Sequence, residues 1–395
     1  MRRLLTPRLA LLASAHFTID AYSSFFSPLL PLMMTRLHLD LTRVGALVAL
    51  ASVSSSFAQP VYGWLSDRLS RPWFIVFGPL VAASFMSGVG MASTFSVLVA
   101  LLMLGGMGVA AFHPQAAALA GEGAAKRSLA MSLFVTGGTL GFSLGPIFAV
   151  TLVGRVGLER TWLAVFPGVA MGIALLFWAM RLTPRTHAER PRAALRELRP
   201  VLRPLTLLYL AVVCRSAVSY GFMTFLPIYL HRHGYSVQAG GMLLTAYLAS
   251  GACGGFLGGW LAERWGGRRV VVASFIGAAP LFLAFLVLPV SLGLVSLIAG
   301  SFVLQASLPV NVVLGQELSP RHSSTISSLL MGAAWGVGAL LIGPIGVLAD
   351  RAGLTWALGC LACLTLGGLA CAVALPESHP RRISADLNAP LATAD

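Results

Sequence analysis

Two short stretches of the chain, Gly63-Trp64-Leu65-Ser66-Asp67-Arg68 and Gly259-Trp260-Leu261-Ala262-Glu263-Arg264, are nearly identical. They lie 196 residues apart in a chain of 395 residues, which is about half its length. Each stretch ends an apolar run and is followed by further arginines, Arg71 after the first and Arg268 after the second. A repeat at half the length indicates a tandem duplication, a construction that many secondary transporters share.

The composition is that of a polytopic membrane protein. Hydrophobic residues make up 57% and charged residues 10% of the chain, and the mean hydropathy is +0.84. Soluble domains carry about a quarter charged residues. Apolar runs near the bilayer-spanning length of about 20 residues predict twelve helices, at roughly 9–34, 43–66, 73–92, 95–120, 128–153, 162–181, 204–230, 237–262, 270–289, 291–316, 324–349 and 354–375.

The net charge of +14 reflects membrane topology and does not point to nucleic acid. With a cytoplasmic N-terminus, the segments on the cytoplasmic side hold 20 Lys and Arg residues and the outer loops hold six. This is the positive-inside bias. We therefore expect a multi-pass protein of the bacterial inner (plasma) membrane, with both termini cytoplasmic, the lipid bilayer as a partner and no nucleic-acid partner.

The duplication extends through the whole chain and divides it into parts. Gly145-Pro146 is matched by Gly343-Pro344, and Pro31 by Pro227. We predict an all-α membrane protein with two pseudo-symmetric six-helix bundles, 1–181 and 204–376, joined by a basic cytoplasmic connector, 182–203, and followed by a disordered cytoplasmic tail, 377–395. The first apolar run could also be a signal peptide, but its length and its match in the second half favour an uncleaved helix.

The doubled stretch resembles the signature loop of the major facilitator superfamily. The resemblance implies the fold of that family, with twelve transmembrane helices. It also implies a cytoplasmic gate built from an acid–arginine network at Gly63, Asp67, Arg68, Arg71, Gly259, Glu263, Arg264 and Arg268. A plain solvated turn that serves only topology is the alternative for a single copy.

Charged groups inside the predicted spans are the candidates for coupling. His16 and Asp20 lie on one face of the first helix, and a carboxylate within a span is costly unless it faces a cavity or a partner. Arg215 corresponds to position 19 in the first half, so we expect it to face Asp20 across a central cavity. His113, followed by Pro114, could bind protons or an anion. A static Asp20–Arg215 ion pair and a packing histidine remain alternatives.

Other polar and aromatic residues at matching depth predict the walls of a substrate cavity: Tyr22, Gln59, Gln115, Tyr220, Phe222, Gln305 and Asn311. A glycine stripe, Gly137, Gly141 and Gly145 before Pro146, allows close helix packing and also resembles the antiporter motif of facilitator exporters. We expect no metal site, because the five cysteines fall within predicted spans without a matching ligand set.

Several short motifs narrow the resemblance to the fosmidomycin-resistance branch of the superfamily: His16-Phe17-x-x-Asp20, Gln59-Pro60-x-x-Gly63, Phe112-His113-Pro114 and Thr224-Phe225-Leu226-Pro227. Members of that branch resemble proton-coupled exporters of drugs and metabolites. The chain departs from the branch at Gln115, where Glu is common, and near Leu102, where many proton-coupled facilitators carry arginine. These departures shift the expected proton coupling to Asp20, assisted by His16 or His113.

The sequence thus predicts a secondary active transporter, not an enzyme, that exports a drug-like and possibly anionic, fosmidomycin-like solute in exchange for protons. It would use the proton gradient and no cofactor, with a small molecule and protons as partners, and we expect a monomer. A proton-coupled symporter that imports a sugar or an organic acid is the alternative. A non-transporting membrane sensor is a further one.

Overall fold

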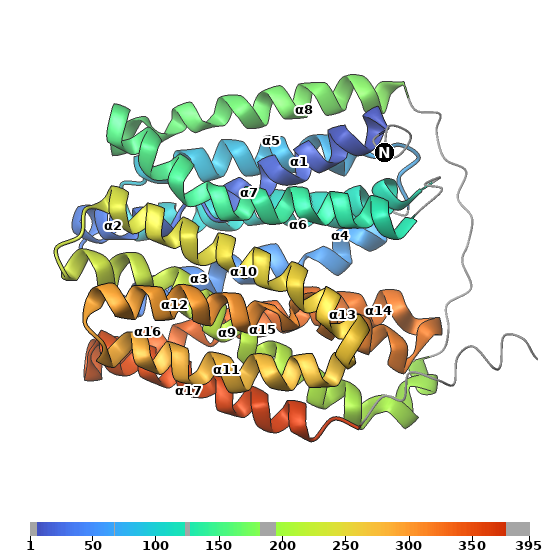
Figure 1. Cartoon of the computed structure of the whole chain (residues 1–395). Helices are drawn as coiled ribbons and strands as arrows, with labels where there is room; N and C mark the ends of the chain where they lie inside the picture. Colours follow the sequence, from blue (N-terminus) through green and yellow to red (C-terminus); the bar gives the residue numbers. More distant parts are fainter. Residues whose placement is uncertain (1–5, 67, 123–126, 182–194, 377–395) are drawn as a thin grey trace, which may run out of the picture.

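The computed structural model describes residues 6–66, 68–122, 127–181 and 195–376, and all regular elements of these residues are helices (Figure 1). The α-helices are α1 (Pro7–Ser23), α2 (Leu30–Leu37), α3 (Leu41–Ser52), α4 (Gln59–Ser66), α5 (Trp73–Ser87), α6 (Phe95–Gly121), α7 (Arg127–Val156), α8 (Val165–Met180), α9 (Leu202–Arg232), α10 (Val237–Trp265), α11 (Gly267–Val287), α12 (Val290–Gln305), α13 (Ser307–Leu318), α14 (Ser323–Ser328), α15 (Ala334–Leu340), α16 (Ile342–Ala352) and α17 (Leu354–Val373).

Eleven helical segments of the described residues are long and apolar enough to cross a membrane. They coincide with eleven of the twelve predicted spans; the predicted run 95–120, for example, is the helix Phe95–Gly121. Only a helix satisfies its backbone polar groups within one segment, so each apolar run folds in this way in lipid.

The first predicted span forms two helices instead of one. Helix α1 is 17 residues long, and after a bend the chain continues through a short 3-10 helix, Ser27–Leu29, into α2. Pro28 and Pro31 cause the break, because proline lacks the N–H that would bond the carbonyl four residues earlier. The two parts together occupy the predicted position of the first span.

Two of the membrane-crossing segments contain a π-helical turn. One turn, η2 (Val53–Phe57), joins α3 to α4, and the other, η7 (Leu329–Ala333), joins α14 to α15. The two turns contact each other between the first and second halves of the chain. Single π turns often mark functional positions in helices, and here both lie at the seam of the molecule.

We call the described residues up to Arg181 the N-half and those from Leu195 onward the C-half. Figure 1 shows the N-half in blue to green above the C-half in yellow-green to red, with the helices of both halves running roughly side by side. The halves meet where α3 packs against α16 and α7 against α10. The end of the molecule marked N in Figure 1, where α1 begins, is the predicted cytoplasmic end, and the other is the predicted outer end.

Hydrogen bonds join the halves at the predicted outer end. The carboxylate of Asp350 on α16 accepts from the backbone N–H of Leu41 at 3.1 Å and of Thr42 at 2.7 Å, and from the Thr42 hydroxyl at 2.6 Å. The Thr245 hydroxyl accepts from the N–H of Ile147 at 3.1 Å. An anion at the first turn of a helix is stabilised by the free N–H groups there, so Asp350 holds α3 from the opposite half.

Candidate functional site

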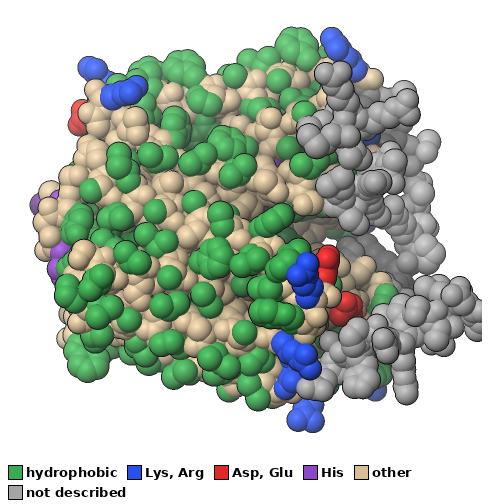
Figure 2. All heavy atoms as spheres, in the orientation of Figure 1, with side chains coloured by type: hydrophobic (Ala, Val, Ile, Leu, Met, Phe, Trp, Pro, Cys, Tyr) green, Lys and Arg blue, Asp and Glu red, His purple; other side chains and the backbone are tan. Residues whose placement is uncertain are grey.

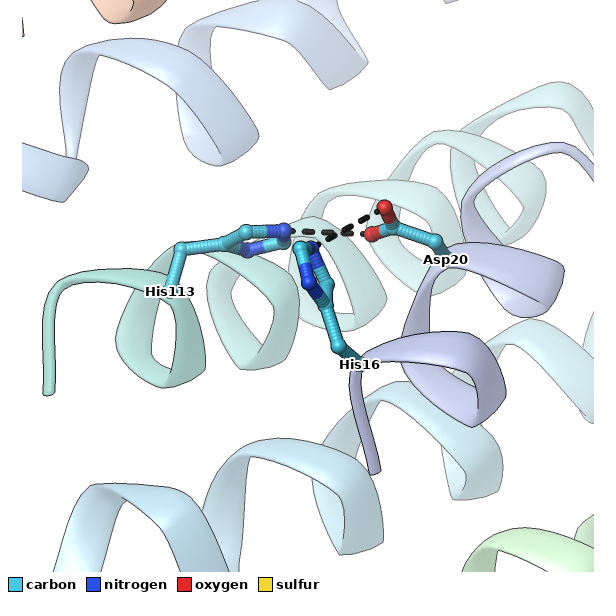
Figure 3. Close-up of side chains that lie close together, drawn as sticks. All are labelled: His16, Asp20 and His113. Atoms are coloured by element: carbon cyan, nitrogen blue, oxygen red, sulfur yellow. Dashed lines mark hydrogen bonds and ion pairs between the residues drawn. The ribbon is translucent and has the colours of Figure 1, made fainter. Parts of the chain in front are cut away.

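The most distinctive polar feature of the interior is a cluster of His16 and Asp20 from α1 with His113 from α6 (Figure 3). His16 Nε2 lies 3.2 Å from one oxygen of Asp20, and His113 Nε2 lies 3.1 Å from the other. Their side chains are mostly buried, with exposures of 9% for His16, 17% for Asp20 and 25% for His113. The three residues that the sequence proposed for coupling in the N-half therefore do meet.

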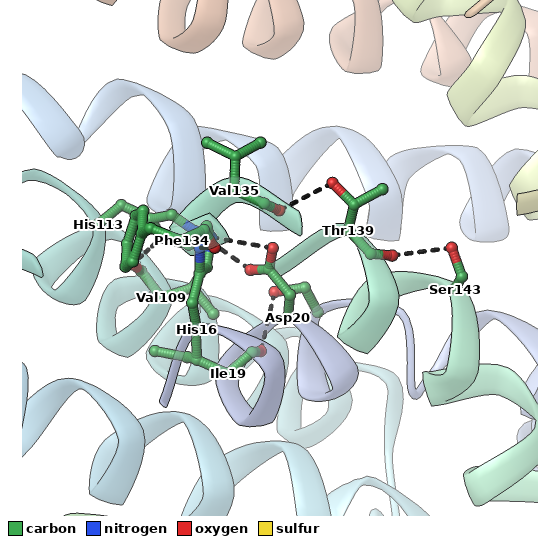
Figure 4. A network of polar contacts seen from close by, with 10 residues as sticks. His16, Ile19, Asp20, Val109, His113, Phe134, Val135, Thr139 and Ser143 are labelled. Atoms are coloured by element: carbon green, nitrogen blue, oxygen red, sulfur yellow. Dashed lines mark hydrogen bonds and ion pairs between the residues drawn. The ribbon is translucent and has the colours of Figure 1, made fainter. Parts of the chain in front are cut away.

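Backbone carbonyls determine which ring nitrogen of each histidine carries a hydrogen. Nδ1 of His16 donates to the carbonyl of Phe134 at 2.8 Å, and Nδ1 of His113 donates to the carbonyl of Val109 at 2.7 Å (Figure 4). A carbonyl can only accept, so both Nδ1 atoms are protonated and both Nε2 atoms face the carboxylate. Each Nε2–Asp20 contact then needs one proton between the two atoms, carried either by Nε2 or by the carboxyl oxygen, and the cluster has room for two such protons.

Close packing of α1 on α7 fixes this geometry. The glycines of the predicted stripe lie directly against the α1 backbone: Gly137 against Ala13 and Gly141 against Phe17. A Cβ at the neighbouring Gly138 would clash with the imidazole ring of His16, which also stacks on Phe134 with ring centroids 4.2 Å apart. The antiporter-like stripe thus holds His16 and Asp20 on α1 close to α7, as small residues do between membrane helices.

The same three side chains could hold a metal ion. Their ligand atoms lie within 4.8 Å of one another, and a histidine that donates its second N–H to a carbonyl is oriented as metal-binding histidines usually are. The sequence predicts no metal, and a proton satisfies the same geometry. A metal ion and protons would therefore compete for these three side chains.

Arg215 on α9 does not pair with Asp20, contrary to the prediction. Its Nη1 donates to Gln305 Oε1 at 2.8 Å and its Nη2 to the hydroxyl of Ser216 at 3.3 Å. The guanidinium also lies 4.9 Å from the ring centroid of Trp335. The expectation failed because repeat-related positions share a depth and not a side-chain direction, while the two histidines satisfy Asp20 locally.

Two of the predicted cavity residues lie at or near the seam between the halves. Gln59 donates to its own helix at Ser55, and its Oε1 lies 4.0 Å from the position of a Cβ built at Gly332 in the C-half. Tyr220 is half-buried and meets Trp335 edge-on, with ring centroids 5.8 Å apart. The structure places these residues where a solute between the halves could touch them.

Two other predicted cavity residues are part of the packed core and line no cavity. The hydroxyl of Tyr22 donates to the Ala164 carbonyl and accepts from the N–H of Gly168, which pins α1 to α8. Phe222 is fully buried and stacks on Phe282 with ring centroids 4.7 Å apart. Aromatic residues of a span face protein, lipid or cavity with similar sequence patterns, so the pattern alone misassigned both.

Gln115, which was predicted to line the cavity, instead forms hydrogen bonds within the N-half. Its Oε1 accepts from the N–H of Ile75 at 3.0 Å, and its Nε2 donates to the hydroxyl of Ser66 at 2.8 Å. Its repeat counterpart Asn311 is just as deeply buried, yet both of its amide atoms are without a hydrogen-bond partner among the described residues.

The doubled gate motif adopts one geometry twice at the predicted cytoplasmic end. The guanidinium of Arg68 lies 3.3 Å from the ring centroid of Trp64, and that of Arg264 lies 3.9 Å from Trp260. A Cβ at Gly63 would contact Pro114, and one at Gly259 would contact Pro309. In this conformation each arginine thus contacts the tryptophan four residues before it, in its own half.

The remaining gate residues brace the ends of helices within each half. Arg71 donates to the carbonyls of Ala179 and Met180 at the end of α8, and Arg268 donates to Val373 at the end of α17. Basic side chains stabilise helix C-termini in this way. Glu263 is exposed, and Asp67 lies outside the described residues, so the predicted acid–arginine network is not tested at that position.

Two residues that the sequence did not single out belong to the functional framework. Asp350 seals the predicted outer end, and Trp335 covers Arg215. Asp350 had no clear signal, because its counterpart at position 154 is glycine and most acidic residues of this chain, such as Asp20 and Asp40, likewise lack an acidic counterpart in the other half. Trp335 had none, because tryptophan in a span is common at lipid-facing positions.

Comparison with known proteins identifies the family. The profile of the Major Facilitator Superfamily matches residues 12–343. The chain is 28% identical to the uncharacterized MFS-type transporter YfnC of Bacillus subtilis (strain 168) over 95% of its own length and 94% of that protein. It is 26% identical to the fosmidomycin resistance protein of Escherichia coli (strain K12), over 94% and 93% of the two chains.

Solved structures agree with the fold. A bacterial homolog of the human lysosomal transporter Spinster superimposes with a TM-score of 0.77 at 16% identity, covering 92% of this chain and 95% of that one. The match of the family profile spans most of both halves, the gate motif occurs in each, and the helices have the arrangement of a solved facilitator. The chain is a multi-pass membrane protein that belongs to the Major Facilitator Superfamily.

Proposed function

We propose that this secondary transporter exports a small, drug-like organic solute in exchange for protons, by alternating access in the bacterial inner membrane. The observation that carries the proposal is the cluster of His16, Asp20 and His113. Intramembrane ionisable groups of this kind mark ion and proton pathways by default, and histidine exchanges protons near neutral pH.

The geometry of the cluster gives a reason for proton exchange. Both Nδ1 atoms are committed to backbone carbonyls, so a proton can enter or leave only at the Nε2 atoms or at the carboxylate. When both protons leave, the Asp20 carboxylate faces two nitrogen lone pairs. That arrangement is repulsive and unsatisfied in a buried site. The unloaded cluster therefore takes up protons readily, and a carrier for protons needs this property.

The proposal replaces the role first expected of Arg215. The sequence predicts that Arg215 faces Asp20 across a central cavity, but the partners of Asp20 are the two imidazoles. In the revised scheme, protons bind in the N-half and the solute binds elsewhere between the halves. The export direction and the drug-like solute rest on likeness to the fosmidomycin resistance protein, whose name denotes resistance.

Import of a sugar or organic acid by proton symport is the second candidate, since either gradient can drive alternating access. Inside-out membrane vesicles separate the two. Under an imposed inward-acidic gradient, an antiporter accumulates labelled fosmidomycin inside the vesicle, whereas a symporter does not. A sensor that moves no solute shows neither uptake nor release.

The decisive variant is Asp20→Asn, which keeps the side-chain shape and removes the charge. We expect gradient-driven uptake of fosmidomycin into inside-out vesicles to fall to the level of empty vesicles, because both histidines lose the anion that holds their protons. His113→Gln should reduce uptake in the same direction. Zinc ions added at neutral pH should inhibit the wild type if they compete with protons for the cluster.

Asp40→Asn is the matched control, because Asp40 caps α3 at the predicted outer end and asparagine caps a helix equally well. It should transport at the wild-type rate. Full pH-driven uptake by Asp20→Asn would show that the proton site lies elsewhere, and wild-type vesicles that move no labelled solute in either direction would argue for the sensor.

A further inference from the structure

A buried positive charge in the C-half lacks a counter-ion. Arg215 lies in the middle of α9 and is only 1% exposed. Among the described residues, no carboxylate oxygen lies within 4.0 Å of its nitrogens, and its Nε has no hydrogen-bond partner. Burying an unpaired charge is expensive, and such charges in membrane spans face a partner or a ligand.

The obvious internal partner is already occupied. Asp20 is the only other charged residue in the middle of a span, and its carboxylate is held by His16 and His113. When those histidines carry protons, the cluster has no negative charge left to offer. Arg215 is then the charge for which the interior of the protein supplies no compensation.

The groups around Arg215 leave a path for a ligand. Its neutral partners are Gln305 and Ser216, and the face of Trp335 covers the guanidinium. Gln305, Trp335 and the adjacent Tyr220 are each partly exposed, although Arg215 itself is not. A swing of Gln305 or Trp335 would uncover the planar edge of the guanidinium, which binds carboxylate and phosphonate oxygens in a two-point fashion.

We propose that Arg215 binds the anionic group, a carboxylate or a phosphonate, of the transported solute, and that Trp335 is the cover which this anion displaces. The proposal rests on the proposed function in that it assumes a transported organic solute, but it requires no proton coupling. The aromatic faces of Trp335 and Tyr220 suit an apolar or aromatic body attached to the anion.

The position of Trp335 connects binding to the seam. Trp335 is the second residue of α15, which follows the π turn η7, and its neighbour Gly336 packs against Phe57 of η2 in the N-half, where a Cβ built at Gly336 would lie 2.8 Å from the Phe57 ring. The proposed displacement of Trp335 would therefore act next to the point where the two π turns meet. Such a displacement would link solute binding in the C-half to the N-half.

The test is solute binding to the purified full-length protein in lipid nanodiscs at one fixed pH, without any gradient. The probes are benzoate for a carboxylate, fosmidomycin for a phosphonate and benzamide as the uncharged counterpart of benzoate. We expect at least one anion to bind and raise the thermal stability of the wild type, while benzamide does not. Whichever anion binds identifies the preferred acid group.

Two variants assign the effect to Arg215. Arg215→Gln should weaken binding of that anion by about 30-fold or more, as the loss of one member of a buried charge pair does. Gln305→Glu supplies an internal carboxylate for Arg215, so it should fold and yet lose anion binding. Arg203→Gln, on the same helix at the exposed predicted cytoplasmic end, is the matched control and should bind like the wild type.

The outcomes separate this inference from the proposed function. An Asp20→Asn protein that binds the anion normally but fails in pH-driven transport supports both. Equal binding of benzoate and benzamide, undiminished anion binding in Arg215→Gln or Gln305→Glu, or a wild type that binds none of the anions overturns the anion site. None of these binding results determines the outcome of the transport assay, which tests the proposed function separately.

Discussion

The two ends of the molecule differ in where their polar contacts lead. At the predicted outer end, Asp350 and Thr245 of the C-half bind backbone N–H groups of the N-half. At the predicted cytoplasmic end, Arg68 and Arg264 stack on tryptophans four residues earlier in the same half. Among the described residues, polar groups thus join the halves at the outer end, while these two arginines contact rings of their own half at the other.

This contrast defines the conformation and what must change in it. Figure 2 shows the surface hollowed between the halves on the side of the predicted cytoplasmic end. Among the described residues, hydrogen bonds join the halves at the outer end, and the hollow lies at the opposite, predicted cytoplasmic end. For the solute to pass, the outer hydrogen bonds must break while the stacked arginines become available for other partners.

Among the variants that test this difference between the two ends, Asp350→Ala should have the largest effect on the opening of the outer end. It removes a carboxylate that accepts three hydrogen bonds across the seam, worth about 1–2 kcal/mol at a partly exposed helix N-terminus. That energy shifts the balance between the two states roughly 5- to 30-fold toward an open outer end. Spin labels at Thr94 and Leu292, both exposed at this end, should report a longer distance in a cysteine-free background.

Glu159→Gln is the control for that variant, since Glu159 lies at the same end and pairs with Arg36 within the N-half. It should leave the label distance unchanged. An Asp350→Ala protein with the wild-type distance distribution would mean that the carboxylate does not hold the outer end closed.

A smaller shift in the same direction is expected for Thr245→Val. The variant keeps the side-chain shape and removes the hydroxyl that accepts from Ile147 across the seam, a neutral bond worth about 1 kcal/mol. The same label pair should show a modest gain of the long distance. Thr139→Val provides the comparison, because the Thr139 hydroxyl donates to the carbonyl of Val135 on its own helix. If both variants changed the label distance equally, the hydrogen bond between the halves would not be the cause.

The smallest effect should come from Trp64→Leu at the predicted cytoplasmic end. The variant removes a cation–π contact worth about 0.5–1 kcal/mol at an exposed site, which favours the present state. The population with an open outer end should therefore rise less in Trp64→Leu than in Asp350→Ala. Trp162→Leu, an exposed tryptophan at the outer end, should have no such effect, and a larger response there than in Trp64→Leu would contradict the role of the stack.

The fold could be predicted from the sequence because a bilayer requires apolar spans of similar length, and each such span forms a helix. Hydropathy located the helix Phe95–Gly121 to within one residue, and the repeat supplied the two halves. The break after α1 and the π turns Val53–Phe57 and Leu329–Ala333 could not be seen. They leave the apolar run intact, and hydropathy measures composition, not helical phase.

The candidate site was predictable only where local geometry decides it. The spacing of His16 and Asp20 by one helical turn placed them together. His113 was an independent candidate, and three-dimensional packing brought it to the same carboxylate. The directions of the side chains could not be predicted. Tyr22 and Phe222 point into the core, and Arg215 bonds Gln305 instead of Asp20. Such choices depend on neighbours that no single sequence displays.

The glycine stripe of α7 has a consequence for the proposed proton site. It presses α7 against α1, and the carbonyl of Phe134 that orients His16 belongs to α7. His113 adds α6, so among the described residues all hydrogen-bond partners of the cluster belong to the N-half. In the proposed alternating-access cycle, the cluster would move with the N-half and keep its internal distances. Its protons would then change sides because the opening between the halves changes sides, so the proposal requires no chain of proton-relay groups.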